Sequence, residues 1–221
     1  MRRSARKMVA AAGLVLAGCA SNALDEDELV YTAIGASDAF GIGAVPITDG
    51  YVFRIEDALE RDGSEVALIN LGIPAANTDR INGAVHIFTK TGVRANLVTV
   101  WVGANDLIDG VDVDDFEDEL EELLDRVQKG MEAVVVIANI PDLTELPRFQ
   151  TEPDPDVTLE RVEAYNDVIE EAADDRDIPV VELFAEDIGD ELVSDVDGFH
   201  PNNAGHQEIA DAFLVVIRPT I

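Results

Sequence analysis

Five short runs of apolar and β-branched residues recur along the chain without any alternation of polar positions. Strands that are buried on both faces of a parallel sheet have this pattern. The five predicted strands are Val30–Ile34, Val66–Leu71, Leu97–Val102, Val134–Ile140 and Ile178–Phe184.

Amphipathic patterns with a helical period lie between these runs. The clearest spans residues 116–127, with apolar residues on one face, acidic residues on the other, and Gly130 after its end. The alternation of strands and helices predicts one three-layer α/β/α domain over residues 30–221, with a five-stranded parallel sheet. The other predicted helices are about 53–59, 78–88, 159–173 and 203–217.

The N-terminal segment differs from the rest of the chain. Four basic residues precede an apolar run, Met8 to Ala17. The run is shorter than the roughly 20 residues that a bilayer requires, but it suits the core of a signal peptide. It ends in Leu16-Ala17-Gly18-Cys19, which resembles a lipobox. We therefore predict a signal peptide at 1–18 and an acidic spacer at 19–29.

Cys19 is the only cysteine, so the chain forms no internal disulfide. If the lipobox is used, the lipid on Cys19 attaches an extracytoplasmic protein to the cell membrane. The alternative is an ordinary signal peptide followed by a chance cysteine, which would give a secreted protein.

The chain is strongly acidic, with 15 Lys and Arg against 46 Asp and Glu and a net charge of −31. Such a surface repels itself unless counterions screen it, and we interpret it as an adaptation to a salt-rich environment. It also makes nucleic acid and anionic membrane surfaces poor partners. The acidic run Asp112–Asp115 lacks the glycine and the spacing of a calcium loop. No cluster has metal-ligand spacing, so no metal site is predicted.

Polar residues follow the predicted strands at four places. Gly35-Ala36-Ser37-Asp38 follows the first strand, Asn70-Leu71-Gly72 ends the second, and Gly103-Ala104-Asn105-Asp106 follows the third. Asp197-Gly198-Phe199-His200-Pro201 lies between the fifth strand and the last helix. Sites in such folds form beyond the carboxyl ends of the strands, so these segments are expected to meet at one edge of the sheet.

The residues at this edge suit nucleophilic catalysis on a carbonyl group. Asp197 can orient the imidazole of His200, which then acts as a general base for the Ser37 hydroxyl. The N–H groups of Ser37 and Gly72 and the side-chain amide of Asn105 could donate to a developing oxyanion. This chemistry needs no cofactor. His86 and His206 lie within predicted helices and are interpreted as structural, and Trp101 as part of the core.

The four segments together resemble the SGNH (GDSL) hydrolase family. Family members carry Gly-Asp-Ser, a central glycine, Gly-x-Asn-Asp and Asp-x-x-His in this order, and the similarity extends from Gly35 to the last predicted helix. The resemblance implies a flavodoxin-like fold, a triad of Ser37, His200 and Asp197, and an oxyanion hole of Ser37, Gly72 and Asn105. Ala36 departs from the pattern, because it replaces the aspartate before the serine; Asp38 could take over part of its local role.

The resemblance implies a hydrolase of carboxylic esters. The α/β-hydrolase elbow, Gly-x-Ser-x-Gly, is disfavoured because the glycines near Ser37 are at positions 35 and 41. The alternative from another class is a lipid-anchored protein that binds a solute or glycan without turnover, which only Ala36 supports.

The substrate is not readable from the sequence. The longest irregular stretch, 141–156, follows the fourth strand, and its Leu143, Leu146 and Phe149 could either line an acyl pocket or cover the core. Small-molecule, lipid and glycan esters all remain candidates, and the protein is expected to be a monomer.

Overall fold

The computed structural model describes residues 9–10, 28–185 and 189–221. Cys19 and nearly all of the predicted signal peptide lie outside these residues, so the signal peptide and the lipid anchor stay predictions. Within the described ranges, no helix combines the length and the apolar character that crossing a bilayer requires.

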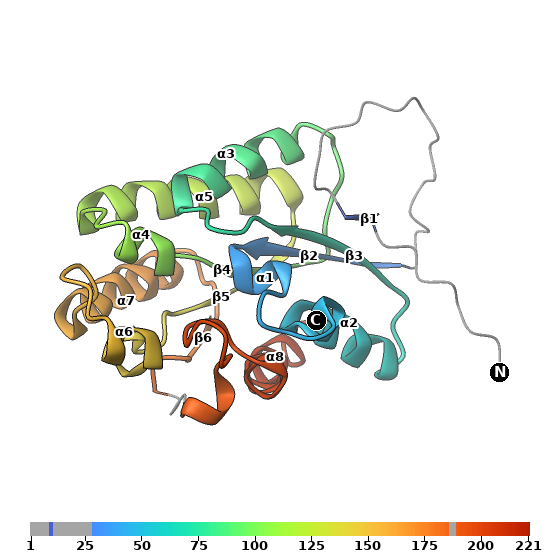
Figure 1. Cartoon of the computed structure of the whole chain (residues 1–221). Helices are drawn as coiled ribbons and strands as arrows, with labels where there is room; N and C mark the ends of the chain where they lie inside the picture. Colours follow the sequence, from blue (N-terminus) through green and yellow to red (C-terminus); the bar gives the residue numbers. More distant parts are fainter. Residues whose placement is uncertain (1–8, 11–27, 186–188) are drawn as a thin grey trace.

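One parallel sheet with the strand order β1-β3-β2-β4-β5-β6 forms the centre of the molecule (Figure 1). The five predicted strands are confirmed as β2 to β6, and β1 adds a two-residue pair at the edge beside β3. The strands are β1 (Val9–Ala10), β2 (Leu29–Gly35), β3 (Val66–Gly72), β4 (Leu97–Trp101), β5 (Val134–Ala138) and β6 (Val180–Val181).

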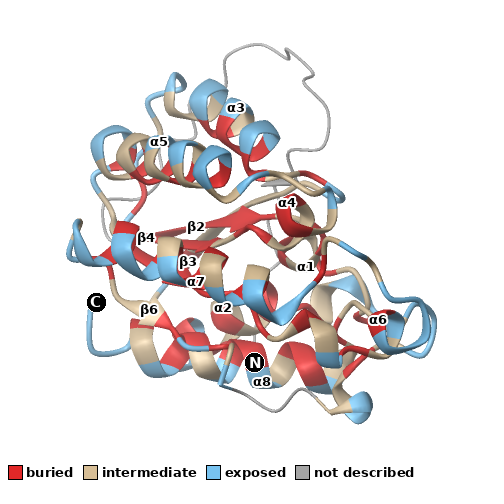
Figure 2. Cartoon of the chain, turned by 90° about the vertical axis from the view of Figure 1, so that its left-hand side faces the viewer, coloured by how far each residue is buried: buried red, intermediate tan, exposed pale blue. Residues whose placement is uncertain are grey.

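Helices cover both faces of the sheet, as the alternating pattern predicted (Figure 1). One face carries α2 (Tyr51–Arg61) and α8 (Asn203–Ile217). The other face carries α3 (Thr78–Thr89), α5 (Val113–Met131) and α7 (Leu159–Asp174). The buried residues of each helix face the sheet, while its exposed residues face outward (Figure 2).

Two apolar layers join the helices to the sheet. On the α5 side, the rings of Phe116 and Tyr165 stack with centroids 4.3 Å apart and connect α5 to α7. On the α8 side, Tyr51 and Phe213 stack at 5.4 Å and connect α2 to α8. All four side chains are fully buried, and burying each stabilises the fold by about 1.5–3 kcal/mol. The two layers hold the sheet rigidly beneath the loops at its carboxyl edge.

The register of the strands decides which loops meet. Gly35, the last residue of β2, pairs with Gly72 of β3 on one side and with Trp101 of β4 on the other. The segments that follow β2, β3 and β4 therefore leave the sheet at the same level along the strand direction. This confirms that the polar segments after these strands gather at one edge.

Several predicted boundaries differ from the structure, most by one or two residues. Helix α5 continues past Gly130 and ends at Met131, because Glu132 adopts the left-handed conformation (φ +56°) that closes the helix. Strand β6 covers only part of the predicted run, because the side-chain oxygen of Asn139 accepts the N–H groups of Leu183 and Phe184 and the sheet pairing stops there. The stretch 141–156 is not wholly irregular.

Short helices account for the elements that the sequence pattern missed. Two are single helical turns at the sheet edge, α1 (Ser37–Phe40) and α4 (Ala104–Ile108), and one, α6 (Pro147–Thr151), lies within 141–156 and begins with a proline in its first turn. The remaining ones are 3₁₀ turns at Ile47–Asp49, Leu143–Glu145 and Asp190–Leu192.

His206 has the structural role predicted from the sequence. It is fully buried in α8, where its Nδ1 accepts the N–H of Tyr51 at 3.2 Å and its Nε2 donates to the carbonyl of Ile42 at 2.9 Å. These bonds fasten the start of α2 and the loop after α1 to α8. Burial lowers the pKa of His206 to about 4, against the opposing effect of the bond to Ile42.

Acid is therefore expected to destabilise the fold through His206. The folded-state pKa lies below the ordinary value of 6.5, so the neutral ring stabilises the fold fully above that pH, and this contribution is lost as pH falls through about 4. The loss is about 3 kcal/mol. His206→Asn keeps an acceptor for Tyr51 but does not titrate. Urea unfolding at pH 7 and pH 4, at constant salt, should show a smaller pH loss for this variant; an equal loss would contradict the role of His206.

Candidate active site

The nucleophile candidate stands at a close crossing of backbone segments. Ser37 is the first residue of α1, directly beyond β2, and only 6% of it is exposed. A Cβ on Gly35 would lie 2.7 Å from the carbonyl oxygen of Trp101 and 2.9 Å from the Cβ of Ala39. Only glycine therefore lets the chain turn from β2 into α1 at this point. Ala36, the N-cap of α1, provides no side-chain hydrogen bond to the helix.

A histidine and a carboxylate are hydrogen-bonded to Ser37 in series. His200 Nε2 lies 2.9 Å from Ser37 Oγ, and His200 Nδ1 lies 2.7 Å from Asp197 Oδ2. Because an ionised carboxylate can only accept, Nδ1 carries the proton and Nε2 accepts from the serine hydroxyl. The structure thus brings together the three residues that the sequence predicted as a triad.

The turn that carries Asp197 also keeps its carboxyl group ionised. Asp197 Oδ1 accepts the N–H groups of Phe199 and His200, each at 3.0 Å. Partial burial would raise the pKa of Asp197, but the bond from the His200 ring and these two N–H bonds outweigh it and hold the pKa below its ordinary value. Asp197 is therefore a carboxylate at neutral pH.

Contacts from other segments hold this turn in place. The Arg148 N–H donates to the Gly198 carbonyl at 3.0 Å, and the Ser194 N–H donates to the His200 carbonyl at 2.8 Å. The Phe199 ring meets the Phe149 ring edge-on, with centroids 5.9 Å apart. Helix α6 thus supports the turn, which gives Phe149 a role that the sequence did not predict.

Asn105 lies in α4, immediately beyond β4, beside the loop that follows β3. Its side-chain amide donates to the Ala76 carbonyl at 2.9 Å, which leaves a second amide hydrogen. The neighbouring Asp106, almost fully buried, accepts the N–H of Thr78 at 2.9 Å and its hydroxyl at 2.9 Å. Burial raises the pKa of Asp106, against the bonds from Thr78. Together these contacts tie α4 to the start of α3.

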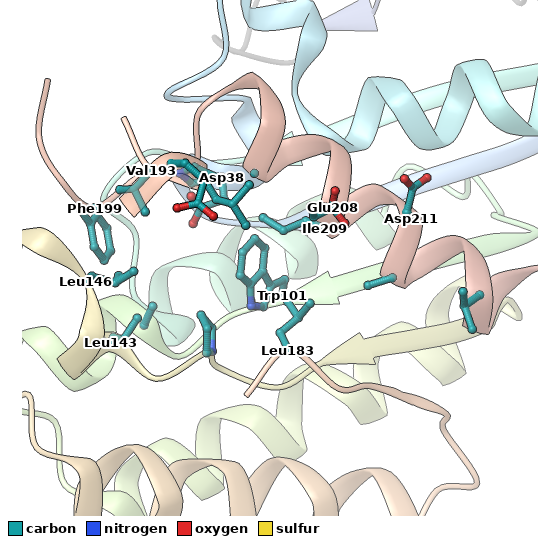
Figure 3. Close-up of a pocket in the computed structure, with 18 residues that line it drawn as sticks. Asp38, Trp101, Leu143, Leu146, Leu183, Val193, Phe199, Glu208, Ile209 and Asp211 are labelled. Atoms are coloured by element: carbon teal, nitrogen blue, oxygen red, sulfur yellow. The ribbon is translucent and has the colours of Figure 1, made fainter. Parts of the chain in front are cut away.

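A cavity of about 500 Å³ opens beside these residues (Figure 3). It lies between α8, the carboxyl ends of β4 to β6 and the segment that leads to His200. Its lining is mostly apolar and includes Leu143 and Leu146, but not Phe149. All three side chains also belong to the buried core. Trp101 packs edge-on against Tyr51 and lines the cavity as well, so it is not only a core residue.

Asp38, the residue after Ser37, lines the same cavity (Figure 3). Burial raises the pKa of Asp38 to about 6, although the charge of the nearby His200 opposes the shift. Among the residues that the structure describes, no group of three or more His, Cys, Asp and Glu side chains is placed to hold a metal ion.

A family profile described as GDSL-like lipase/acylhydrolase matches residues 33–208. The chain belongs to the GDSL-like lipase/acylhydrolase family. Its members hydrolyse esters, so the activity class of this member is a hydrolase that acts on esters. A search of curated proteins found no significant match.

Solved structures share the fold of this GDSL-like protein. The lipase/acylhydrolase from Enterococcus faecalis is 19% identical, with a TM-score of 0.70 over 87% of this chain and 96% of that chain. A psychrotrophic esterase from Pseudoalteromonas sp. is 18% identical, with a TM-score of 0.70 over 86% of this chain and 97% of that chain. A family 3 carbohydrate esterase from Clostridium thermocellum is 16% identical, with a TM-score of 0.69 over 85% of this chain and 94% of that chain.

Gly72 has a different environment from the one predicted. Its N–H donates to Asn70 Oδ1 at 2.8 Å, and the Asn70 amide donates in turn to the Ala39 carbonyl at 2.7 Å. This N–H already has a partner, so it would have to leave Asn70 to donate to an oxyanion, and the role of Gly72 as an oxyanion donor stays a prediction. Gly72 also allows β3 to approach α1: a Cβ here would overlap the Phe40 nitrogen and lie 2.7 Å from the Ala39 carbonyl carbon.

Ala75 is the residue that sequence reasoning missed in the loop after β3. It is exposed and has φ +56°, a conformation that an L-residue seldom adopts. Its N–H has no hydrogen-bond partner among the described residues. The adjacent Ala76 carbonyl is the one that accepts the Asn105 amide. A glycine at position 75 would have pointed to this turn, whereas alanine gives no such signal.

Replacing Gly72 with alanine is expected to lower both the free energy of unfolding and the ester turnover of this GDSL-like protein. The new Cβ must push α1 away from β3, so both the free energy of unfolding and the position of Ser37 should change; overpacking of this kind costs about 1–3 kcal/mol. Gly83 in α3 has open space around it and is the matched control. Gly83→Ala should stabilise the helix by up to about 1 kcal/mol. Urea unfolding and ester turnover test both variants; wild-type values for Gly72→Ala would contradict the packing argument.

Proposed function

We propose that the protein is a serine esterase in which Ser37, His200 and Asp197 form the catalytic triad. The observation that carries the proposal is the continuous series of hydrogen bonds from Asp197 Oδ2 through the imidazole to Ser37 Oγ, at 2.7 and 2.9 Å. Series of this kind activate a hydroxyl that is otherwise a weak nucleophile. The proposed substrates are small-molecule carboxylic esters.

In the acylation step, His200 Nε2 takes the hydroxyl proton while Ser37 Oγ bonds to the ester carbonyl carbon. The C=O electron pair moves onto the oxygen and forms the tetrahedral oxyanion. When the C–O bond to the alcohol breaks, His200 returns the proton to the leaving oxygen. The product alcohol departs, and the acyl group remains on Ser37. The anionic Asp197 stabilises the imidazolium between these transfers.

Donors for the oxyanion are proposed from three segments. The N–H of Ser37 lies at the free N-terminal end of α1, and the Asn105 amide retains one hydrogen after its bond to Ala76. We add the unpartnered N–H of Ala75 in place of that of Gly72. Each donor of this kind contributes about 10²–10³ in kcat in enzymes where it has been removed.

Deacylation repeats the same proton path with water. His200 takes a proton from water, the resulting hydroxide oxygen attacks the acyl carbon, and the proton passes to Ser37 Oγ as the acid is released. No cofactor enters either step. The proposed setting is extracytoplasmic, with the protein attached through a lipid on Cys19, or secreted if Cys19 is not lipidated, and monomeric.

Labelling with a fluorophosphonate probe tests the proposal. The probe phosphonylates only an activated serine, so the wild-type protein should be labelled at Ser37, located by peptide mass analysis. His200→Ala should suppress the labelling, while Asp174→Asn, an exposed change at the end of α7, should not. A folded protein, equilibrated in high salt, that is not labelled would favour a binding protein on the same fold.

A further inference from the structure

The cavity is bordered by the chain neighbours of three of the proposed catalytic groups, Ser37, Asn105 and His200. Asp38 follows the nucleophile, Ala104 precedes Asn105, and Phe199 and Pro201 stand on either side of His200; all four line the cavity. A substrate bound at Ser37 would therefore extend one of its two parts, the acyl group or the alcohol, into this space. A volume of about 500 Å³ is within the usual range for small-molecule sites.

All the charged side chains that line the cavity are acidic. Asp38 is joined in the lining by Glu191, Glu208 and Asp211, and no Lys or Arg is among the residues that line it (Figure 3). Asp38 differs from the other three because it directly follows the nucleophile and lies against the apolar wall. An anionic substrate would meet uncompensated repulsion there.

Within the described part of the chain, the Asp38 carboxylate has no side-chain hydrogen-bond donor, and the nearby His200 is the one cationic side chain that favours its charge. The carboxylate is bonded by its own backbone N–H. Burial disfavours its charge and raises its pKa more than the charge of His200 lowers it. A carboxylate in this situation gains most from a ligand that brings a positive charge.

We propose that Asp38 makes the enzyme selective for esters that carry a cationic group, an ammonium or quaternary ammonium, on the part that enters the cavity. The proposal rests on the proposed esterase function. The aromatic ring of Trp101, which lines the same cavity, provides a second attraction, because aromatic faces bind cations. The apolar wall accommodates the carbon substituents of such a group.

Two esters of the same shape and different charge test the selectivity. The acetate ester of choline (acetylcholine) carries a trimethylammonium group, and 3,3-dimethylbutyl acetate carries a tert-butyl group in its place. The ratio of their kcat/KM values cancels any effect on the steps at Ser37 that both share. The wild-type protein should prefer the cationic ester by roughly tenfold or more, the preference that corresponds to about 1.4 kcal/mol.

Asp38→Asn removes the charge and preserves the shape. It should bring the ratio close to one, whereas Asp174→Asn, the same change at an exposed position in α7, should leave the ratio as in the wild type. A wild-type ratio near one, or an unchanged ratio in Asp38→Asn, would overturn the proposal.

Hydrolysis of p-nitrophenyl acetate distinguishes a failure of the cation selectivity from a failure of the esterase function. If that neutral ester is cleaved and the cationic ester is not preferred, Asp38 does not select for cations, but the esterase function stands. If neither p-nitrophenyl acetate nor the two matched esters is cleaved and the fluorophosphonate does not react, the esterase function fails and the selectivity fails with it.

Discussion

Ser37→Ala is expected to reduce ester turnover by about 10⁴-fold or more while the fold remains intact. The loss is this large because the acyl group has no other place to be transferred, and removing a triad serine leaves only the contribution of the oxyanion hole and of binding. The side-chain hydroxyl of Ser37 bonds only to His200 among the described groups. Its removal should therefore change the free energy of unfolding by about 1 kcal/mol or less.

The measurement is kcat/KM for p-nitrophenyl acetate together with urea unfolding of the same preparations. Ser64→Ala is the matched control, since Ser64 precedes β3 at the opposite end of the strand from the site. This control should retain wild-type turnover. If Ser37→Ala retained turnover within tenfold of the wild type, another residue would have to be the nucleophile.

The sheet was predictable because burial on both faces leaves a simple trace in the sequence. The strands β2, β4 and β5 are apolar throughout or carry only a buried threonine, as Thr32 and Thr99 show. Their order in the chain, with helices between them, then implies parallel strands and one carboxyl edge. The contact between Ser37 and His200 followed from this topology, since the two residues are 163 residues apart but both lie at that edge.

The short elements were not predictable, because tertiary contacts form them. Helices α1 and α4 have only a single turn each and no repeating apolar stripe. They form because they continue from strand ends that are already fixed. The end of β6 likewise depends on Asn139, a residue 44 positions from the N–H that it accepts.

The oxyanion hole shows what a motif leaves undetermined. The sequence identifies Gly72 as a glycine at a strand end, but the N–H of that glycine is bonded to a side chain two residues earlier, Asn70. The donor that we propose instead, the N–H of Ala75, depends on the conformation of the loop, in which Ala75 has a positive φ. Residue type alone therefore does not show that Gly72 is needed for the close packing of β3 against α1.

The acyl-pocket prediction was limited for a similar reason. Apolar residues near a site can face the cavity, the core or both, and composition does not separate these outcomes. Leu143 and Leu146 do both, while Phe149 packs against Phe199 and supports the turn that carries His200. The charged member of the lining, Asp38, was visible in the sequence, but its orientation toward the cavity was not.

Asp197→Asn is expected to reduce turnover by about 10³–10⁴-fold through the tautomer of His200 rather than through its position. Asp197 Oδ1 accepts two backbone N–H groups, so the carbonyl oxygen of an asparagine should take that place. The amide nitrogen must then face His200 Nδ1, and because it donates, Nδ1 has to accept. The ring proton moves to Nε2, which can no longer accept the proton of Ser37.

Asp195 provides a control within the same turn. It is exposed and loses the same charge on substitution, so Asp195→Asn should stay within about twofold of the wild type in kcat/KM. The free energy of unfolding should be similar in both variants, since an asparagine at 197 preserves the backbone bonds of the turn. If Asp197→Asn were no slower than Asp195→Asn, Asp197 would only support the turn, and His200 would act without a fixed tautomer.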